Sequence, residues 1–326
     1  MAFKSLNRRG FIKASAAVAA GAAFPMPALA QKGKSDTLTI ILNSAPGGPS
    51  DITLRILQEP LGKELNRSVV IDFKAGAGGA LGLNAVSRAP KDGSTIAWSF
   101  SGPGSYYSTV VKDLGYDPGK DLAPITLFSY SPQIFGANPK FPANDIAGLI
   151  ELAKKSPGSI KVANGGKVSP SGIAVVKLAK LAKIDIVSVP YSGGNPAVQA
   201  AVAGEVPVYS SAYGSLPEGL VKEGRLKVLG VGTKGRWSLL PNYPSVDETV
   251  PGFTANVSFG FVAPAGTPPD IIRSLNAAIT KVIMLPDVKP KLVANYFDPM
   301  PSTPEEYGAI IKREIEEDGP ILASLQ

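Results

Sequence analysis

Four short turns combine small residues with hydroxyl or amide side chains, and each stands between a predicted strand and a predicted helix. They span residues 45–51, 75–80, 164–171 and 191–196. Glycines in such a turn let the backbone approach a ligand closely, and the following helix start presents unpaired N–H groups with a partial positive charge. Each turn is therefore a candidate anion site. The alternative is that each merely ends a strand, as Gly and Pro often do.

Several side chains in these turns allow both a ligand role and a structural role. Asp51 can face a ligand, or it can cap the following helix or pair with Arg55 one turn on, and the structural role is favoured. Ser169 and Ser171 flank a proline at a predicted helix start, so one is expected to cap the helix and the other to bond the ligand. Tyr191 can offer its hydroxyl to a ligand or pack as an aromatic beside the preceding proline.

The composition excludes most hydrolytic chemistry. The 326-residue chain has no His and no Cys, so it lacks a Ser-His-Asp triad, an imidazole base, a His-ligated metal and disulfides. Only Lys167 and Asp51 are candidates for catalysis, and no nucleophile–base pair is visible. Residues 76–82 superficially resemble a dinucleotide loop, but no convincing βαβ unit follows, and there is no P-loop motif. We expect no enzyme activity, no cofactor and no metal.

The turns join elements that alternate between strand and helix. Apolar runs predict buried strands over residues 38–42, 69–73, 95–100, 160–163 and 186–189. Helical spacing of apolar residues follows each turn. This alternation predicts an α/β fold with parallel sheets and helices on both faces, and such sheets bind ligands at the carboxyl ends of their strands. The charged residues at 305–306 and 312–314 are expected to form a solvated helix face.

The length of the chain favours two lobes rather than one small sheet. Extended segments at 122–139 and 225–232 are expected to cross between the lobes. Lobe I would then contain residues 31–130 and 230–326, and lobe II residues 131–229. Each lobe is expected to be a mostly parallel sheet flanked by helices.

The amino terminus has the pattern of an export signal. Arg8, Arg9 and Lys13 precede an uncharged run that closes on small residues at 28–30. This predicts a cleavable signal over residues 1–30 that resembles the twin-arginine type, and a general secretory signal is the alternative. The mature protein is then expected in the periplasm. Removing the four basic residues of the signal from the chain's 33 leaves 29 against 26 acidic residues, which gives no reason to expect nucleic-acid binding.

Short motifs follow one another in a set order along the whole mature chain. They are Pro46-Gly47-Gly48-Pro49-Ser50-Asp51, Gly76-Ala77-Gly78-Gly79, Lys91-Asp92-Gly93-Ser94-Thr95, Ser169-Pro170-Ser171, Val189-Pro190-Tyr191-Ser192-Gly193-Gly194, Tyr243-Pro244-Ser245-Val246, Pro251-Gly252-Phe253 and Ala263-Pro264-Ala265-Gly266-Thr267-Pro268. Each motif alone is common, whereas the ordered set is specific. It resembles the periplasmic solute receptors of tripartite tricarboxylate transporters, also called Bug proteins.

The resemblance implies a two-lobed, Venus-flytrap periplasmic-binding-protein fold that holds a small carboxylate through backbone amides, hydroxyls and bridging waters. It also implies a monomer that delivers its ligand to a tripartite-type membrane permease, with docking on a sensor kinase as the alternative. Together with the turns, it predicts a cleft lined by Pro46, Gly47, Gly48, Ser50, Asp51, Gly78, Asn164, Ser169, Ser171, Tyr191, Gly193 and Gly194.

Departures from the family pattern bear on the ligand. The family usually has an acidic residue shortly after Gly204 and an aspartate closing the next strand, where this chain has Pro207 and Ser211. In amino-acid-binding members the aspartate would meet the ligand's ammonium group. We therefore predict a mono-, di- or tricarboxylate without an amino group, with Ser211 as a neutral donor or acceptor. Ser258 replaces a usual tryptophan, which bears on the shape of the cleft.

Overall fold

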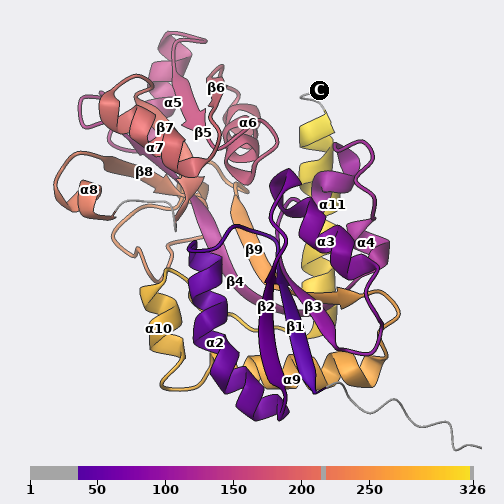
Figure 1. Cartoon of the computed structure of the whole chain (residues 1–326). Coiled ribbons are helices and arrows are strands. Elements are labelled where there is room, and N and C mark those ends of the chain that lie inside the picture. The colour runs from indigo at the N-terminus through magenta and orange to yellow at the C-terminus, as the bar shows by residue number, and fades with distance from the viewer. Residues whose placement is uncertain (1–35, 214–217, 324–326) are drawn as a thin grey trace, which may run out of the picture. The chain divides into compact units, whose positions relative to one another are not determined.

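One 16-residue strand, β4 (Leu122–Ala137), belongs to both halves of the sheet in the computed structural model, which describes residues 36–213 and 218–323 (Figure 1). Its first part pairs with β9 (Asn256–Pro264), and its last part pairs with β7 (Val208–Ala212) and β8 (Lys227–Val231). The strand order is β2-β1-β3-β9-β4-β7-β5-β6, with β8 beside β4. The predicted signal at residues 1–30 lies outside the described residues.

The first half of the sheet contains three parallel strands, β1 (Thr37–Leu42), β2 (Ser68–Phe73) and β3 (Thr95–Phe100), with β9 antiparallel to β3. Successive side chains of a strand point to opposite faces. Accordingly, Ile40 packs with α2 and α9 on one face, and Ile41 packs with α3 and α11 on the other. The second half contains β5 (Lys161–Asn164) and β6 (Val187–Pro190), which are parallel to each other, and β5 is also parallel to β7.

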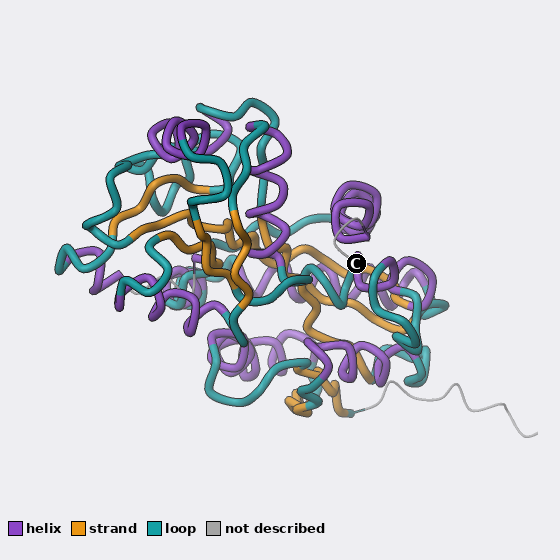
Figure 2. The backbone as a smooth tube through the Cα atoms, turned by 90° about the horizontal axis from the view of Figure 1, so that it is seen from above, coloured by secondary structure: helices purple, strands orange, loops and turns teal. Residues whose placement is uncertain are grey.

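Helices flank the strands of both halves on both sides, as seen from above in Figure 2. The helices that follow the predicted turns are α2 (Pro49–Leu65), α3 (Ala80–Ser87), α6 (Pro170–Ala182) and α7 (Gly194–Ala203). The other helices are α4 (Pro118–Asp121), α5 (Ile146–Lys155), α8 (Glu218–Lys222), α9 (Pro269–Ile283), α10 (Lys289–Ala294) and α11 (Pro304–Ala323). Among the described residues, no helix is both long and apolar enough to cross a membrane.

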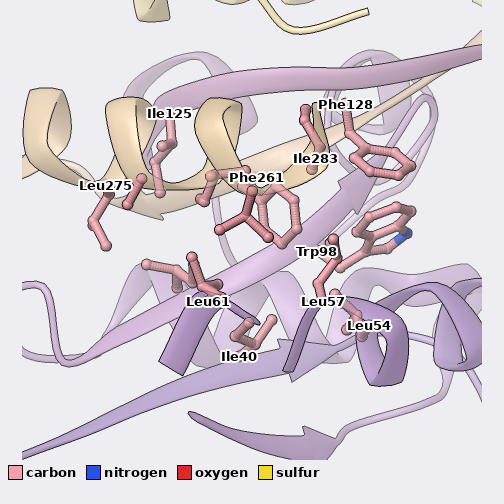
Figure 3. Packing of buried hydrophobic residues seen from close by; sticks show 14 of the residues in the cluster. Ile40, Leu54, Leu57, Leu61, Trp98, Ile125, Phe128, Phe261, Leu275 and Ile283 are labelled. Carbon is pink, nitrogen blue, oxygen red and sulfur yellow. The ribbon is translucent and has the colours of Figure 1, made fainter. Parts of the chain in front are cut away.

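The core of the first half gathers around Trp98 in β3 (Figure 3). The Trp98 ring centre lies 5.0 Å from that of Phe128 and 5.3 Å from that of Phe261. Leu57 of α2 and Leu275 of α9 complete this layer from the helices. Two further clusters cover the two faces of the second half, one with α5 and α6 and the other with α7. Separate cores on each half hold the strand ends, and hence the turns, in place.

The expectation for residues 225–232 is wrong. This segment does not cross between the halves but forms β8, which pairs with the last part of β4. The chain stays with the second half as far as Phe253, which packs in the cluster of α5 and α6, and it returns only where Asn256 pairs with Pro132. An apolar strand pattern indicates that a strand is buried, but not which strand lies beside it. The sequence therefore did not distinguish a crossing between the halves from pairing within the second half.

Candidate functional site

The predicted turns lie at the carboxyl ends of two sets of strands that face each other. The loop after β3 forms η2 (Tyr106–Thr109), and Tyr106 packs against Ile173 of α6. Since β1, β2 and β3 are parallel, and β5, β6 and β7 run together in the other half, this contact sets the two carboxyl edges opposite each other. Gly78, from the turn after β2, lies at the same edge, because a Cβ there would be 2.9 Å from the Tyr107 hydroxyl.

The two turns of the second half lie against each other. Asn164 at the end of β5 is opposite Pro190 at the end of β6, and the Tyr191 N–H donates to the Asn164 carbonyl at 2.8 Å. A Cβ on Gly165 would lie 3.0 Å from the backbone nitrogen of Gly194. A side chain at Gly165 would force the Gly194 backbone to shift, so glycine favours this approach. The structure therefore brings together the predicted residues of the 164–171 and 191–194 turns.

The serines of the first of these turns hold the turn itself. The Ser169 hydroxyl accepts the Gly172 N–H at 3.1 Å and so caps α6, as expected for one of the two serines. The buried Ser171 hydroxyl accepts the Gly165 N–H at 2.9 Å and lies 3.0 Å from the Ser169 hydroxyl. A ligand contact of Ser171 stays a prediction.

The Asn164 side chain is also engaged within the protein. Its Oδ1 accepts the Gly166 N–H at 3.1 Å, and its Nδ2 donates to the Ser188 hydroxyl at 2.8 Å. These bonds tie the end of β5 to β6 and shape the turn. These contacts give the Asn164 side chain a structural role in the turn. Its predicted contact with the ligand stays a prediction.

The starts of α2 and α7 differ from that of α6 because glycine is their N-cap. Neither Gly48 nor Gly193 provides a side-chain cap, and the first-turn N–H groups of a helix have no partners within the helix. A Cβ on Gly48 would meet nothing closer than the Ala45 carbonyl at 3.9 Å, and one on Gly193 nothing closer than Pro196 at 3.8 Å. A side chain at either glycine would thus make only an ordinary contact, so both helix starts leave room for an anion.

Of the remaining predicted residues of the first turn, three are accessible to solvent, and Asp51 is bonded within the protein. Pro46 and Gly47 are exposed, and Ser50 is partly exposed. Asp51 is buried, and its Oδ2 accepts the Gly47 N–H at 2.8 Å while its Oδ1 lies 2.8 Å from Arg55 Nε. Gly47 has a φ of +82°, which favours glycine at this position. Asp51 thus closes the turn, and Arg55 balances its charge near the helix start.

Tyr191 and Ser211 lie deeper in the second half. Tyr191 is partly buried against the cluster that covers the α7 face. Ser211 in β7 pairs with Ile134 of β4 and is 2% exposed, and its hydroxyl has no hydrogen-bond partner among the described residues. A buried hydroxyl without a partner costs about 1–3 kcal/mol. A hydrogen bond to water or to a ligand group would remove this cost, which supports the predicted role of Ser211 as a donor or acceptor.

Asn43 is a candidate that the sequence reasoning missed. It follows β1 directly, is 2% exposed, and neither its Oδ1 nor its Nδ2 has a partner within the described part of the chain. A Cβ on Gly79 would lie 3.0 Å from its Nδ2, so the amide lies beneath the turn after β2. A signal was available, because Asn164 occupies the equivalent position at the end of β5 in the other half. Over residues 36–213 and 218–323 no group of three acidic residues could hold a metal ion.

The chain is similar to known proteins over most of its length. Residues 53–326 match the family model described as the tripartite tricarboxylate transporter family receptor. Residues 5–25 match the signal sequence of the twin-arginine translocation pathway, and they lie outside the described residues. A UPF0065 protein from the tcbD–tcbE intergenic region of Pseudomonas sp. strain P51 is 31% identical over 287 residues, covering 86% of this chain and 84% of that relative.

Two solved structures share the fold. MatC from Rhodopseudomonas palustris with bound malate is 28% identical with a TM-score of 0.72, and the match covers 88% of this chain and 98% of that one. The periplasmic binding protein BugD is 26% identical with a TM-score of 0.72, and the match covers 89% of this chain and 97% of that one. These similarities confirm the predicted periplasmic-binding-protein fold.

Proposed function

Because this chain belongs to the receptor family of tripartite tricarboxylate transporters, we propose that it binds a small mono-, di- or tricarboxylate between its two facing sheet edges and delivers it to a membrane permease. Members of the family are periplasmic solute receptors and not enzymes, and this chain carries a twin-arginine export signal. The observation that carries the proposal is the pair of glycine-capped helix starts, α2 and α7, which leave room for an anion at opposite edges. The malate bound to MatC supports a carboxylate ligand.

A carboxylate suits these helix starts for electrostatic reasons. The first turn of a helix offers several N–H donors and a positive dipole end, each favourable to an anion by about 0.3–1 kcal/mol. Asp51 does not repel the ligand, because its charge is balanced by Arg55 and by the Gly47 N–H. Direct N–H bonds and bridging waters from two edges together support an affinity in the micromolar range, about −8 kcal/mol.

Ligand capture requires the two halves to move as lobes. The proposed lobe I contains residues 31–130 and the carboxyl-terminal part, and the proposed lobe II begins at residue 131. The sequence placed the return boundary at residue 230, but Phe253 packs with the second half and β9 begins at Asn256. We place the return near residue 255, so that β4 and β9 provide the hinge segments.

The proposed ligand has no amino group. By the family resemblance, Ser211 stands where an aspartate would pair with an ammonium, and its buried hydroxyl is neutral. A buried ammonium without an opposite charge is costly, because desolvation is not repaid by a hydroxyl alone. Carboxylates that carry only carboxyl and hydroxyl groups avoid this cost.

A thermal-shift screen tests the proposal. Carboxylates such as malate, succinate and citrate are expected to raise the melting midpoint of the mature protein, and amino acids are not. A ligand at 100 times its Kd stabilises the folded state by about 2.7 kcal/mol, which is a rise of roughly 5 °C for a protein of this size. The protein is first shown to be ligand-free by native mass spectrometry. A rise with amino acids alone, or none with any carboxylate, would contradict the proposal.

Ser211→Asp tests the proposed ligand class. An aspartate at this position is expected to supply the missing partner for an ammonium, and so to raise the affinity for an amino acid such as glutamate at least about tenfold, or 1.4 kcal/mol. Isothermal titration calorimetry measures the change. Ser211→Asn is the matched control, because it adds a polar group of similar size without charge. An unchanged amino-acid affinity in folded Ser211→Asp would leave the ligand class without support.

A further inference from the structure

The last helix, α11, joins both halves of the fold. Its first turns place Tyr307 and Ile311 in a cluster with β1 and β3 of the first half. Its end places Leu322 against Ile173 of α6, in the second half. Figure 1 shows α11, in yellow, running past the first half of the sheet toward α6. The helix is therefore part of the same contact between the halves as Tyr106 and Ile173, next to the turn at residues 164–171.

A small polar cavity lies at this junction. Its volume is about 50 Å³, and its lining comes from both halves and from both hinge strands: Tyr106 of η2, Tyr130 of β4, Lys177 of α6, Asn256 of β9 and Glu314 of α11 are among the residues that line it. The Tyr106 hydroxyl and Asn256 Oδ1 are buried without hydrogen-bond partners among the described residues. Pro170, which lies between the predicted ligand residues Ser169 and Ser171, also lines the cavity. The cavity is polar and large enough for water.

Glu314 is buried beside this cavity, contrary to the solvated face expected for residues 312–314. It is 9% exposed, and its Oε1 accepts hydrogen bonds from Ser101 at 2.8 Å and from Ser258 at 2.6 Å. Burial raises the pKa of Glu314 to about 7, although the serine hydrogen bonds oppose the rise. The reason is visible in the spacing, since Glu314 shares the buried stripe of α11 with Tyr307 and Ile311.

Asp318 lies one turn further along α11 and also lines the cavity. Burial raises its pKa to about 6, with a smaller rise from Glu317, while Lys177 and Arg313 lower it. Lys177 Nζ of α6 lies 3.8 Å from Glu317 Oε2 and so forms an ion pair between the halves. The ionisable groups around both acids are thus three tyrosines, Tyr106, Tyr130 and Tyr307, and the charged groups of α6 and α11.

We propose that this junction is a proton-linked latch, in which the meeting of α11 and α6 buries Glu314 and Asp318 in their neutral forms, so that acid favours the closed arrangement. The latch consists of the cavity-lining residues of these helices, Ile173 among them, together with Leu322. It rests on the lobe closure of the proposed function. A receptor with such a latch holds its ligand more tightly in an acidic periplasm than in a neutral one.

The direction of the effect follows from the two arrangements. Separation of the helices opens the cavity that they share to water, and the pKa values of both carboxyls then fall toward the ordinary 4.5 of Glu and 3.8 of Asp, although Glu314 keeps its bonds to Ser101 and Ser258. The closed arrangement then holds protons that the open one releases. The free-energy preference for the closed arrangement is complete below about pH 4. It is lost as the pH rises through 6 to 7, where the pKa values of the two acids lie in the closed arrangement.

Spin labels on the two halves measure the latch directly. The chain has no cysteine, so Val187→Cys in β6 and Met284→Cys after α9 create two unique labelling sites, at positions that are 40% and 44% exposed. Pulsed electron paramagnetic resonance gives the distance distribution of the ligand-free mature protein at pH 5 and pH 8. The ratio of open to closed molecules is expected to be at least about tenfold higher at pH 8. An identical distribution at both pH values would overturn the proposal.

Three variants separate the latch from general effects of pH. Glu314→Gln and Asp318→Asn each remain neutral at both pH values and are expected to reduce the dependence, most strongly for Glu314→Gln. Glu316→Gln is the matched control, because Glu316 is an exposed acid on the same helix, near Lys312, and it should keep the full dependence. The latch is rejected if Glu314→Gln or Asp318→Asn folds and keeps the full pH dependence of the open-to-closed ratio.

Adding malate, succinate or citrate to the same labelled protein distinguishes the two proposals. If pH shifts the distances and no carboxylate does so at either pH, the proposed carboxylate ligand fails and the latch stands. If carboxylates close the lobes and the ligand-free distribution is the same at pH 5 and pH 8, the proposed function stands and the latch is rejected.

Discussion

Gly193→Trp is expected to weaken carboxylate binding at least about 100-fold, or 2.7 kcal/mol, and to leave the protein folded. Gly193 is the N-cap of α7, and its φ of 165° is extended backbone that tryptophan adopts without strain. The nearest atom to an added Cβ is Pro196 Cδ at 3.8 Å, so the indole extends into the space in front of the helix start. The loss arises because the side chain occupies the anion position and covers the first-turn N–H groups. Titration calorimetry with the carboxylate found in the thermal screen measures it.

Gly48→Trp repeats this test from the opposite edge. Gly48 has a φ of −81°, and the space beside it is equally open, with the Ala45 carbonyl at 3.9 Å as the nearest atom. We expect a loss of affinity of similar size, because both helix starts must contact one ligand for the proposal to hold. Gly219→Trp in α8 is the matched control, since Gly219 is exposed and nothing lies within 4 Å of an added Cβ. Unchanged affinity in folded Gly193→Trp and Gly48→Trp would show that the site lies elsewhere.

Trp98→Ala is expected to lower the free energy of unfolding by about 3–5 kcal/mol. The indole is fully buried in β3, and its ring centre lies within 6.0 Å of those of four phenylalanines, Phe128, Phe259, Phe261 and Phe297. Truncation leaves a cavity among rings from β4, β9 and the segment after α10, which cannot all close around an alanine. Urea denaturation followed by circular dichroism measures the loss.

Trp98→Phe provides the control, with an expected cost below about 1.5 kcal/mol. Phenylalanine keeps most of the aromatic contacts. It also removes the indole N–H. This group is buried without a hydrogen-bond partner among the described residues and therefore lowers the stability of the parent protein. A cost of less than about 1.5 kcal/mol for Trp98→Ala would show that this layer is loosely packed and repacks around the smaller residue.

The strands and turns were predictable because their signals are local. The apolar run at 38–42 became β1, and the small residues after it became the turn before α2. Ser169 was expected as one of two candidate caps and caps α6 through the Gly172 N–H. Periodicity and capping depend on residues within a few positions of each other, so the sequence contains the information needed.

Roles that depend on a distant partner were harder to predict. Residues 225–232 have the pattern of a buried strand, but only the fold shows that the neighbour is the last part of β4. Asn164 and Ser171 were expected near the ligand, and the structure also gives them bonds that shape their own turn. Asn43 was missed because its unpartnered amide depends on its burial beneath the turn after β2.

By itself, the sequence determined the export signal, the α/β alternation, the family and the exclusion of histidine and cysteine chemistry, because each is a property of residue type and order along the chain. Tertiary structure alone decided which helix starts remain uncapped and open, where the chain returns between the halves, and that Glu314 is a buried acid near an interlobe ion pair. The physical reason is that hydrogen-bond partners, burial and the resulting pKa shifts arise from groups far apart in sequence. Only the folded chain brings those groups within contact distance.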